Sequence, residues 1–431
     1  MIQNHPLDLH PNHFRSLMMF VFALANYVLM YAANIVLARS LTVDDFDDYS
    51  VAVSIVTILS TLATLGLEKY ALRAIALFRD RHDWSKFRGF WLFSLRTISG
   101  ISIILVALLG FVLEAILAIH HADYHIAIVI YAGFLPIIAL TLFLVEVMAA
   151  HGAQILSMAI YRLFLPLVYV LLIIGLSFSP LTLTALTAVL CFGFAWLLTF
   201  TVIWFVTQLL MPVEAKKSIP VRLGKKWLRR SLPLVFSSLM LTVMTSSGVV
   251  ILELLFPSGL EVGTYAIAAQ TGGFIALIGT STNRYYLPMM VVMIDRRDKH
   301  AIQRLMSQRF WVVGGLILIL LAILVVSGHK ILGLFGGQFG AGYDTVLIIA
   351  VGASFSALYA DIPYYLQFMG LHRAVLSLTL LATLSMVALG FLLGAEYGVM
   401  GMALAYMMPV VLLFSTLRIM IMLRFRRVLR A

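Results

Sequence analysis

The feature that most constrains this chain is a series of apolar stretches, each long enough for a helix to cross the hydrocarbon core of a bilayer. Twelve such stretches are predicted, at residues 14–37, 49–67, 90–119, 126–150, 155–178, 181–210, 232–256, 262–290, 310–326, 345–370, 374–393 and 398–423. Lipid offers the backbone no hydrogen-bond partner, and the stretches are too long and too uniformly apolar for barrel strands. We therefore expect an all-α integral membrane protein with twelve transmembrane helices.

Composition excludes the main soluble classes. Hydrophobic residues make up 62% of the 431 residues and charged residues 11%, which is more apolar surface than a water-soluble core absorbs. The single cysteine, Cys191, excludes disulfides within the chain and metal sites built from cysteine. The first residues lack the basic start and cleavage site of a secretory signal, so we expect the first helix to be retained.

The basic residues predict the orientation in the membrane. With the N-terminus inside, 27 of the 30 Lys and Arg residues fall in cytoplasmic segments, whereas Arg39 and Lys330 fall outside and Arg96 lies within the third helix. This asymmetry follows the positive-inside rule and predicts cytoplasmic N- and C-termini. It also attributes the net charge of +11 to topology and to contact with anionic membrane lipids, rather than to a nucleic-acid partner.

The hydrophilic connector at residues 211–231 divides the helices into two groups of six. We therefore predict an N-lobe at residues 1–210, a cytoplasmic linker at residues 211–231 and a C-lobe at residues 232–431. None of the predicted outer loops is long enough to fold into a catalytic domain.

Three short similarities relate the two halves at nearly constant offsets of 216, 220 and 218 residues. They pair Tyr49 with Tyr265, Phe90 with Phe310, and Gly152 with Gly370. Because each half has an even number of helices, the repeat is parallel, with its axis along the membrane normal. Two pseudo-symmetric lobes around a central cavity are the usual build of an alternating-access carrier.

The stretch LARSLTVDDFDDYSVAVSI, Leu37 to Ile55, resembles the signature that closes helix one and opens helix two in the Wzx-type polysaccharide flippases of the MOP exporter superfamily. The matching residues are Ala38, Arg39, Leu41, Asp45, Phe46 and Tyr49, while Asp47 stands where that family usually has glycine. Further similar motifs are Gly66, Leu67 and Arg73 at the end of helix two, Leu334 to Phe339, and Gly398 to Ala405.

The resemblance implies two six-helix lobes that carry an undecaprenyl-diphosphate-linked oligosaccharide from the cytoplasmic to the periplasmic leaflet of a bacterial inner membrane. It further implies coupling to a Na⁺ or H⁺ gradient without a cofactor, and a polysaccharide polymerase complex as a partner. The chain contains no glycine-rich P-loop for a nucleotide triphosphate, which agrees with coupling to an ion gradient.

A lipid diphosphate is an anion, so its path should present fixed cations, with Arg favoured for bidentate phosphate contacts. Ionisable residues in membrane helices are costly and are therefore functional candidates. The predicted substrate-binding residues are Arg15, Lys69, Arg73, Arg96 and Arg284. The resemblance to lipid II flippases, whose cavity arginines come from helices one, two and eight, implies this role for Arg15, Arg73 and Arg284. The alternative is that these cations anchor helices at the interface.

Three acids lie in apolar surroundings and are predicted to bind a coupling ion: Glu146, Asp361 and Glu253. Pro363 should kink the tenth helix beside Asp361 and free backbone carbonyls there. The alternative for these acids is an internal ion pair, with Arg96, Arg162 or Arg284 as the partner. Glu253 lies near the outer end of its helix, which favours an interfacial role.

Other functions remain open. A multidrug extruder of the same superfamily fits the fold, but basic residues suit anions better than cationic drugs. A membrane polysaccharide polymerase or glycosyltransferase should carry a polar outer loop with paired catalytic residues, which the longest outer loop, residues 327–344, lacks. We expect no catalytic residue and no metal site, because the loop that holds His120, His121, Asp123 and His125 is too short to close a four-ligand site.

Overall fold

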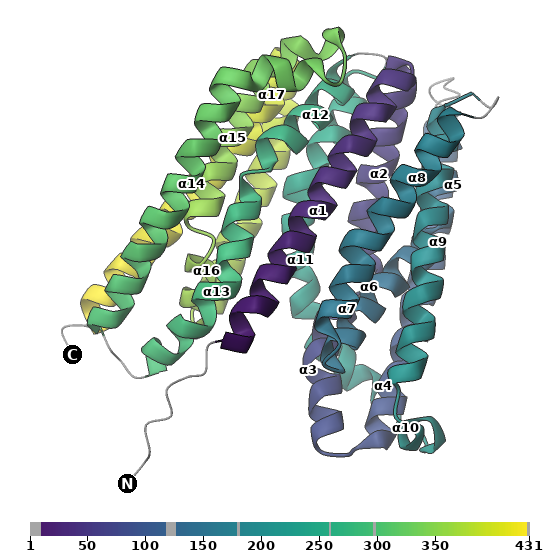
Figure 1. The fold of residues 1–431 in the computed structure, drawn as a ribbon, viewed down its shortest axis with the longest axis vertical. Coiled ribbons are helices and arrows are strands. Elements are labelled where there is room, and N and C mark those ends of the chain that lie inside the picture. The colour runs from purple at the N-terminus through teal and green to yellow at the C-terminus, as the bar shows by residue number, and fades with distance from the viewer. Residues whose placement is uncertain (1–9, 118–125, 179–181, 258–259, 296–298, 429–431) are drawn as a thin grey trace. The chain divides into compact units, whose positions relative to one another are not determined.

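The computed structural model describes residues 10–117, 126–178, 182–257, 260–295 and 299–428, and within these ranges it contains helices and no strand (Figure 1). In the same ranges, nine helices are long and apolar enough to cross a membrane, and eleven spans result when each of two bent pairs counts as one. The all-α fold of a multi-pass membrane protein is thereby confirmed. The number of twelve spans stays a prediction.

The chain groups into two compact units. The N unit comprises residues 28–266, and the C unit comprises residues 267–431 together with residues 1–27. This grouping differs from the predicted lobes, because α11 (Gly224–Leu255) packs on α2 (Val43–Ala63) and α3 (Leu67–Asp80) within the N unit. The division into lobes at residues 211–231 stays a prediction.

The N unit is built from helices on either side of an apolar core. Besides α2, α3 and α11, it contains the second part of α1 (His10–Ser40), α4 (Trp84–Leu117), α5 (Ile126–Gly133), α6 (Leu135–Ala150), α7 (Gln154–Ala159), the π-helix η2 (Ile160–Phe164), α8 (Leu165–Ser177), α9 (Ala185–Leu210), α10 (Val213–Lys217) and the start of α12 (Glu261–Gly273). Figure 1 shows α3, the start of α4 and α10 at one end of this unit.

The C unit contains the rest of α12 and the helices that follow it. These are α13 (Ala276–Asp295), α14 (Lys299–Gly333), the 3₁₀ helix η3 (Gly337–Gly342), α15 (Tyr343–Leu358), α16 (Ile362–Phe368) and α17 (His372–Val428). In Figure 1, α14, α15 and α17 run side by side, in agreement with their packing. Gly398 interrupts α17 with a non-helical backbone, at the start of the last predicted span.

The signature-like stretch forms the corner between α1 and α2. Thr42 is the N-cap of α2, and its hydroxyl oxygen accepts a hydrogen bond from the backbone N–H of Asp45 at 3.2 Å. The Asp45 carboxylate in turn accepts a hydrogen bond from the backbone N–H of Ala185, the first residue of α9, at 2.8 Å. Asp45 therefore ties the starts of two membrane helices together, and Phe46 beside it is buried.

Several spans are broken. The axes of α5 and α6 are bent by 44°, and α15 and α16 are separated at Tyr359–Asp361. Pro363 lies in the first turn of α16, where its missing N–H costs no helical hydrogen bond. The break beside Asp361 thus lies where Pro363 predicts a kink.

Two of the three internal similarities have matching structural features in the two halves of the sequence. Gly152 and Gly370 adopt left-handed backbones, with φ of +87° and +83°, and each ends a helix just before the next one starts. Tyr49 and Tyr265 are both buried. The third pair differs, because Phe90 is buried whereas Phe310 is 37% exposed.

Candidate functional site

The amphipathic helix α3 presents a row of cations on one face. Lys69 and Arg73 on the helix and Arg81 at its C-cap are spaced at multiples of four residues, which places them along one side of α3. Leu67 and Ile75 on the opposite side are fully buried in the core of the N unit. The burial of the apolar face therefore turns the basic face outward.

The first turns of α11 present a second basic row. Lys226 and Arg230, one turn apart, are exposed, while Trp227 between them is buried. The Trp227 ring packs against Phe90 and Phe93 with ring centroids 5.5 and 5.6 Å apart. Burial of an aromatic side chain of this size contributes about 2 kcal/mol, so Trp227 fixes the rotation of α11 and the direction of its cations.

The connector before α11 is packed rather than free. The backbone N–H of Val221 donates to the Ser85 carbonyl of α4 at 3.1 Å, and the Ser218 hydroxyl donates to the Trp84 carbonyl at 2.9 Å. The helix α11 begins at Gly224, before the start predicted at residue 232. Residues predicted as a hydrophilic linker therefore form part of the N unit.

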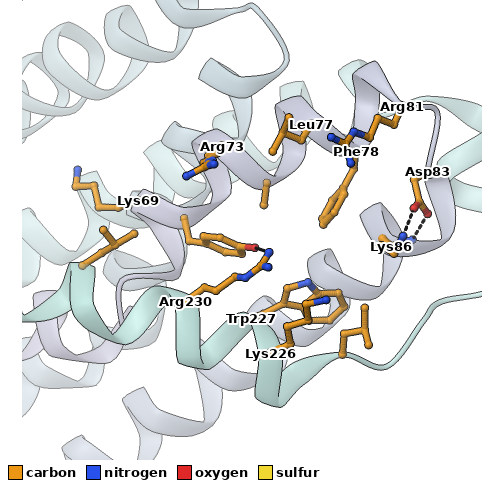
Figure 2. Close-up of a pocket in the computed structure, with 14 residues that line it drawn as sticks. Lys69, Arg73, Leu77, Phe78, Arg81, Asp83, Lys86, Lys226, Trp227 and Arg230 are labelled. Atoms are coloured by element: carbon orange, nitrogen blue, oxygen red, sulfur yellow. Dashed lines mark hydrogen bonds and ion pairs between the residues drawn. The ribbon is translucent and has the colours of Figure 1, made fainter. Parts of the chain in front are cut away.

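A cleft of about 780 Å³ lies between the two basic rows (Figure 2). Its charged lining comprises six cations and one acid, and aromatic rings from α3 and α11 line it as well. The lining residues are Lys69, Tyr70, Arg73, Ala74, Leu77, Phe78, Arg81, Asp83, Lys86, Leu223, Lys226, Trp227, Arg230 and Leu234. All of them belong to the N unit.

The charges in the cleft are not balanced. Lys86 pairs with Asp83 and lowers the pKa of that carboxyl, and Lys69 Nζ lies 3.1 Å from Glu146 Oε1. Figure 2 shows the Asp83–Lys86 pair at one end of the cleft.

The remaining cations have no acidic partner among the residues that the structure describes. They are Arg73, Arg81, Lys226 and Arg230, of which Arg230 donates to the Tyr70 hydroxyl at 3.4 Å. A surplus of four cations, three of them arginines, suits an anion with several negative charges, and phosphate groups are ligands that arginine binds well.

The structure brings two of the five predicted substrate-binding residues together, because both Lys69 and Arg73 line the cleft. Arg96 lies on an exposed face of α4 and does not line it. Arg15 and Arg284 belong to α1 and α13, but their side chains lie outside the described residues.

The predicted ion-coupling acids lie in three separate places. Glu146 on α6 pairs with Lys69, and Asp361 pairs with Arg309 at 2.7 Å. Glu253, on the last turn of α11, lies near the carboxylates of Asp47 and Asp48 on α2. Two of the three acids are thus in ion pairs, with partners other than the three arginines predicted as alternatives.

Arg309 is the centre of a buried polar network in the C unit. Its side chain is 2% exposed, and its guanidinium donates to Asp361, to the Asn283 side chain and to the backbone carbonyls of Ala357 and Leu358, at 2.7 to 3.1 Å. Those carbonyls belong to the last turn of α15, where the break before α16 removes the regular helical donors and leaves Ala357 a turn hydrogen bond of 3.5 Å from the Ala360 N–H. Arg309 therefore satisfies the carbonyls that the break frees.

Sequence reasoning missed four cations of the cleft and the buried arginine. They are Arg81, Lys86, Lys226, Arg230 and Arg309, all of which the sequence assigns to cytoplasmic segments as topology signals. The four-residue spacing from Lys69 to Arg81 was the available signal for a basic helix face. Nothing in the sequence marks Arg309, because its partners come from three other segments.

No metal centre is found among the described residues, since no group of three His, Cys, Asp or Glu side chains could hold an ion there. The histidines His120, His121 and His125 lie outside the described residues.

Solved structures with the same fold are membrane transporters of the MOP superfamily. An inward-facing multidrug resistance MATE family transporter aligns with a TM-score of 0.74 at 14% identity, covering 94% of this chain and 98% of the other. The lipid II flippase MurJ aligns with a TM-score of 0.70 at 14% identity, covering 94% and 87%. A MATE transporter from Vibrio cholerae aligns with a TM-score of 0.63 at 13% identity, covering 96% of each chain. These identities show a shared fold.

The sequence comparisons give the family. No curated protein sequence matches the chain. The family model described as "Polysaccharide biosynthesis protein" matches residues 16–294, which is well over half of the chain and includes the whole basic cleft. With its membrane-spanning helices and the fold of MOP-superfamily transporters, the chain belongs to the polysaccharide biosynthesis protein family.

Proposed function

We propose that this protein is a flippase that translocates an undecaprenyl-diphosphate-linked oligosaccharide across the bacterial inner membrane, from the cytoplasmic leaflet, for the assembly of a surface polysaccharide. The basic cleft is the observation that carries the proposal, because four of its cations lack an acidic partner among the described residues. The family membership and the transporter fold support it.

The cleft suits the diphosphate part of such a substrate. A diphosphate ester carries two or more negative charges, and Arg73 and Arg230 present forked donors from facing helices. By the orientation that the basic residues predict, α3 and the start of α11 face the cytoplasm, where the lipid-linked saccharide is made. Arg15, Arg96 and Arg284 are proposed as further cations along the path, and Glu146, Asp361 and Glu253 as sites for Na⁺ or H⁺.

The same charges disfavour a multidrug cation antiporter. A cationic drug at the cleft would be repelled by the unpaired Arg and Lys side chains. A polymerase or glycosyltransferase needs paired catalytic groups. The cleft is lined by a single acid, Asp83, which forms an ion pair with Lys86.

Transport in liposomes tests the proposal. Purified protein is reconstituted into vesicles that contain a fluorescent undecaprenyl-diphosphate-linked disaccharide in both leaflets, and the fraction that a membrane-impermeant reductant bleaches is followed with time. We expect bleaching to pass from half to nearly all of the label. Bleaching that stops at half, together with uptake of the cationic dye ethidium, would favour the multidrug alternative, and a lengthened saccharide would favour a polymerase.

Matched pairs of substitutions show whether the cleft is the site. Lys226→Ala with Arg230→Ala removes two lining cations, whereas Lys225→Ala with Arg229→Ala removes two exposed cations next to them on α11 that do not line the cleft. We expect the first pair to reduce the flipping rate at least tenfold and the second pair to leave it within about twofold. Equal effects of both pairs would mean that these residues only set the orientation of the protein in the membrane.

A further inference from the structure

Lys69 belongs to two sites at once. Its side chain lines the basic cleft, and its ammonium is also the ion-pair partner of Glu146 on α6. The side chain is 51% exposed, so it has room to turn toward a ligand in the cleft, whereas the Glu146 side chain is 17% exposed and held on a membrane helix. An anion in the cleft and the Glu146 carboxylate therefore compete for the same ammonium.

The competition has a consequence for Glu146. Burial lowers the pKa of the Lys69 ammonium, but the paired Glu146 carboxylate raises it by more, so the lysine is charged in this ion pair. A carboxylate that loses its only cation in a mostly buried position is poorly solvated.

The other groups that interact with this pair do not replace Lys69. Glu68, the neighbour of Lys69 on α3, is buried and adds negative charge, and burial raises the pKa of its carboxyl. Tyr161 from η2 lies near Lys69 and carries no positive charge. No second cation pairs with Glu146 among the residues that the structure describes.

We propose that anion binding in the cleft and proton binding at Glu146 are linked through Lys69: the anion draws Lys69 away, and Glu146 takes up a proton in its place. The inference rests on the anion site of the proposed function and adds the ion that accompanies the substrate. Linkage is reciprocal, so a protonated Glu146 strengthens anion binding by the same factor. Lys69, predicted to bind the substrate, and Glu146, predicted to bind the coupling ion, thus act together as one linked pair.

Inorganic pyrophosphate is the probe, and its affinity for the purified full-length protein is measured by calorimetry between pH 8 and pH 5. Glu146→Gln removes the competitor, so we expect it to bind pyrophosphate about fivefold tighter than the unmodified protein at pH 8, the size expected for one partly exposed ion pair. The ratio of the two affinities should shrink as the pH falls and Glu146 becomes protonated. Using the ratio cancels the protonation of pyrophosphate itself.

Three variants serve as controls. Glu214→Gln removes an exposed acid on α10 outside the cleft and should leave the ratio near one at every pH. Asp83→Asn releases Lys86 and should strengthen binding equally across the range, because Lys86 holds the pKa of Asp83 low and that acid stays ionised. In a Lys69→Ala background, Glu146→Gln should have little effect.

The outcomes separate the two proposals. If pyrophosphate does not bind the unmodified protein, the anion site of the proposed function and the linkage both fail. If it binds but the effect of Glu146→Gln is the same at all pH values, only the linkage fails. A pH dependence that Glu68→Gln abolishes and Glu146→Gln leaves intact would also overturn the proposal, because the proton would then bind at Glu68.

Discussion

Arg309 shows how much a single buried charge holds in place. Its guanidinium donates hydrogen bonds to two side chains and to two backbone carbonyls around the break between α15 and α16. Removing one partner of a buried ion pair leaves the other charge without compensation, which costs about 3–5 kcal/mol.

Arg309→Met should therefore lower the melting temperature of the purified protein strongly, because Asp361 and the carbonyls of Ala357 and Leu358 lose their donor. Arg304→Met, an exposed arginine on the same helix, is the matched control and should change it little. Similar melting temperatures for the two variants, measured by differential scanning fluorimetry, would show that the network does not stabilise the C unit.

His151 predicts an acid-sensitive step in stability. Burial lowers the pKa of its imidazole, which the nearby Arg79 also disfavours in its charged form, although the Val147 carbonyl accepts from the ring. The unfolded chain binds a proton near the ordinary pKa of about 6.5, and the folded chain binds it only at lower pH. The free energy of unfolding should therefore decline as the pH falls below about 6.5.

His151→Gln should flatten this dependence between pH 7 and pH 5, and His372→Gln, an exposed histidine, should not. Melting temperatures across this range are the measurement. An unchanged slope in His151→Gln would place the acid sensitivity in another group.

At the scale of elements, the cleft depends on the close approach of α3 and α11. Gly66 ends the turn between α2 and α3 with φ of +70°, and a Cβ there would lie 2.5 Å from the Ser231 carbonyl and 2.8 Å from the Val235 backbone nitrogen of α11. Both contacts are with backbone atoms, which cannot relieve the clash by a change of rotamer. The two basic rows are therefore held at a distance that only glycine permits.

Gly66→Ala should accordingly lower both the melting temperature and the affinity for pyrophosphate. Gly152→Ala is a matched control, because Gly152 also has a positive φ, of +87°, but a Cβ there meets open space. The control should cost only the backbone strain, about 1 kcal/mol, and should leave pyrophosphate binding unchanged. Equal losses in both variants would mean that strain alone, and not the approach of α11, explains the effect.

The sequence predicts the helices better than it predicts the contacts between them. The apolar stretches and the break beside Pro363 follow from local chemistry and are found in the structure. The start of α11 is different, because Trp227 makes the polar connector pack on α4, and a hydropathy pattern does not contain that contact.

The candidate site is only partly predictable for the same reason. Lys69 and Arg73 stand out as charges at the end of a membrane helix, but Lys226 and Arg230 become part of the cleft only when α11 folds against α3. The residues of an ion pair can be recognised singly, as Glu146 and Lys69 were, whereas their pairing requires the packing of α3 on α6.

At the scale of the whole molecule, the basic residues predict which side of the membrane each segment faces. In a Cys191→Ser background, a cysteine at position 222 (Arg222→Cys) should react with a membrane-impermeant maleimide only in inside-out vesicles, because residues 211–231 are predicted to be cytoplasmic. A cysteine at position 396 (Glu396→Cys) should react in intact cells. Both positions are exposed, so reagent access is not limited by packing. The reverse labelling pattern would invert the topology and place the cleft on the outer side.

The cleft lies entirely within residues 28–266, and this limits what its ligand can do. A ligand shifts a conformational equilibrium only through a difference in affinity between the two states, and a site that belongs to one unit offers the same contacts in each. Binding of the diphosphate there would therefore contribute to substrate recognition without shifting the conformational equilibrium of the transporter. The energy that distinguishes one conformation from another must then come from the sugars or the polyprenyl tail, so a bare diphosphate should act as an inhibitor that occupies the protein without being carried.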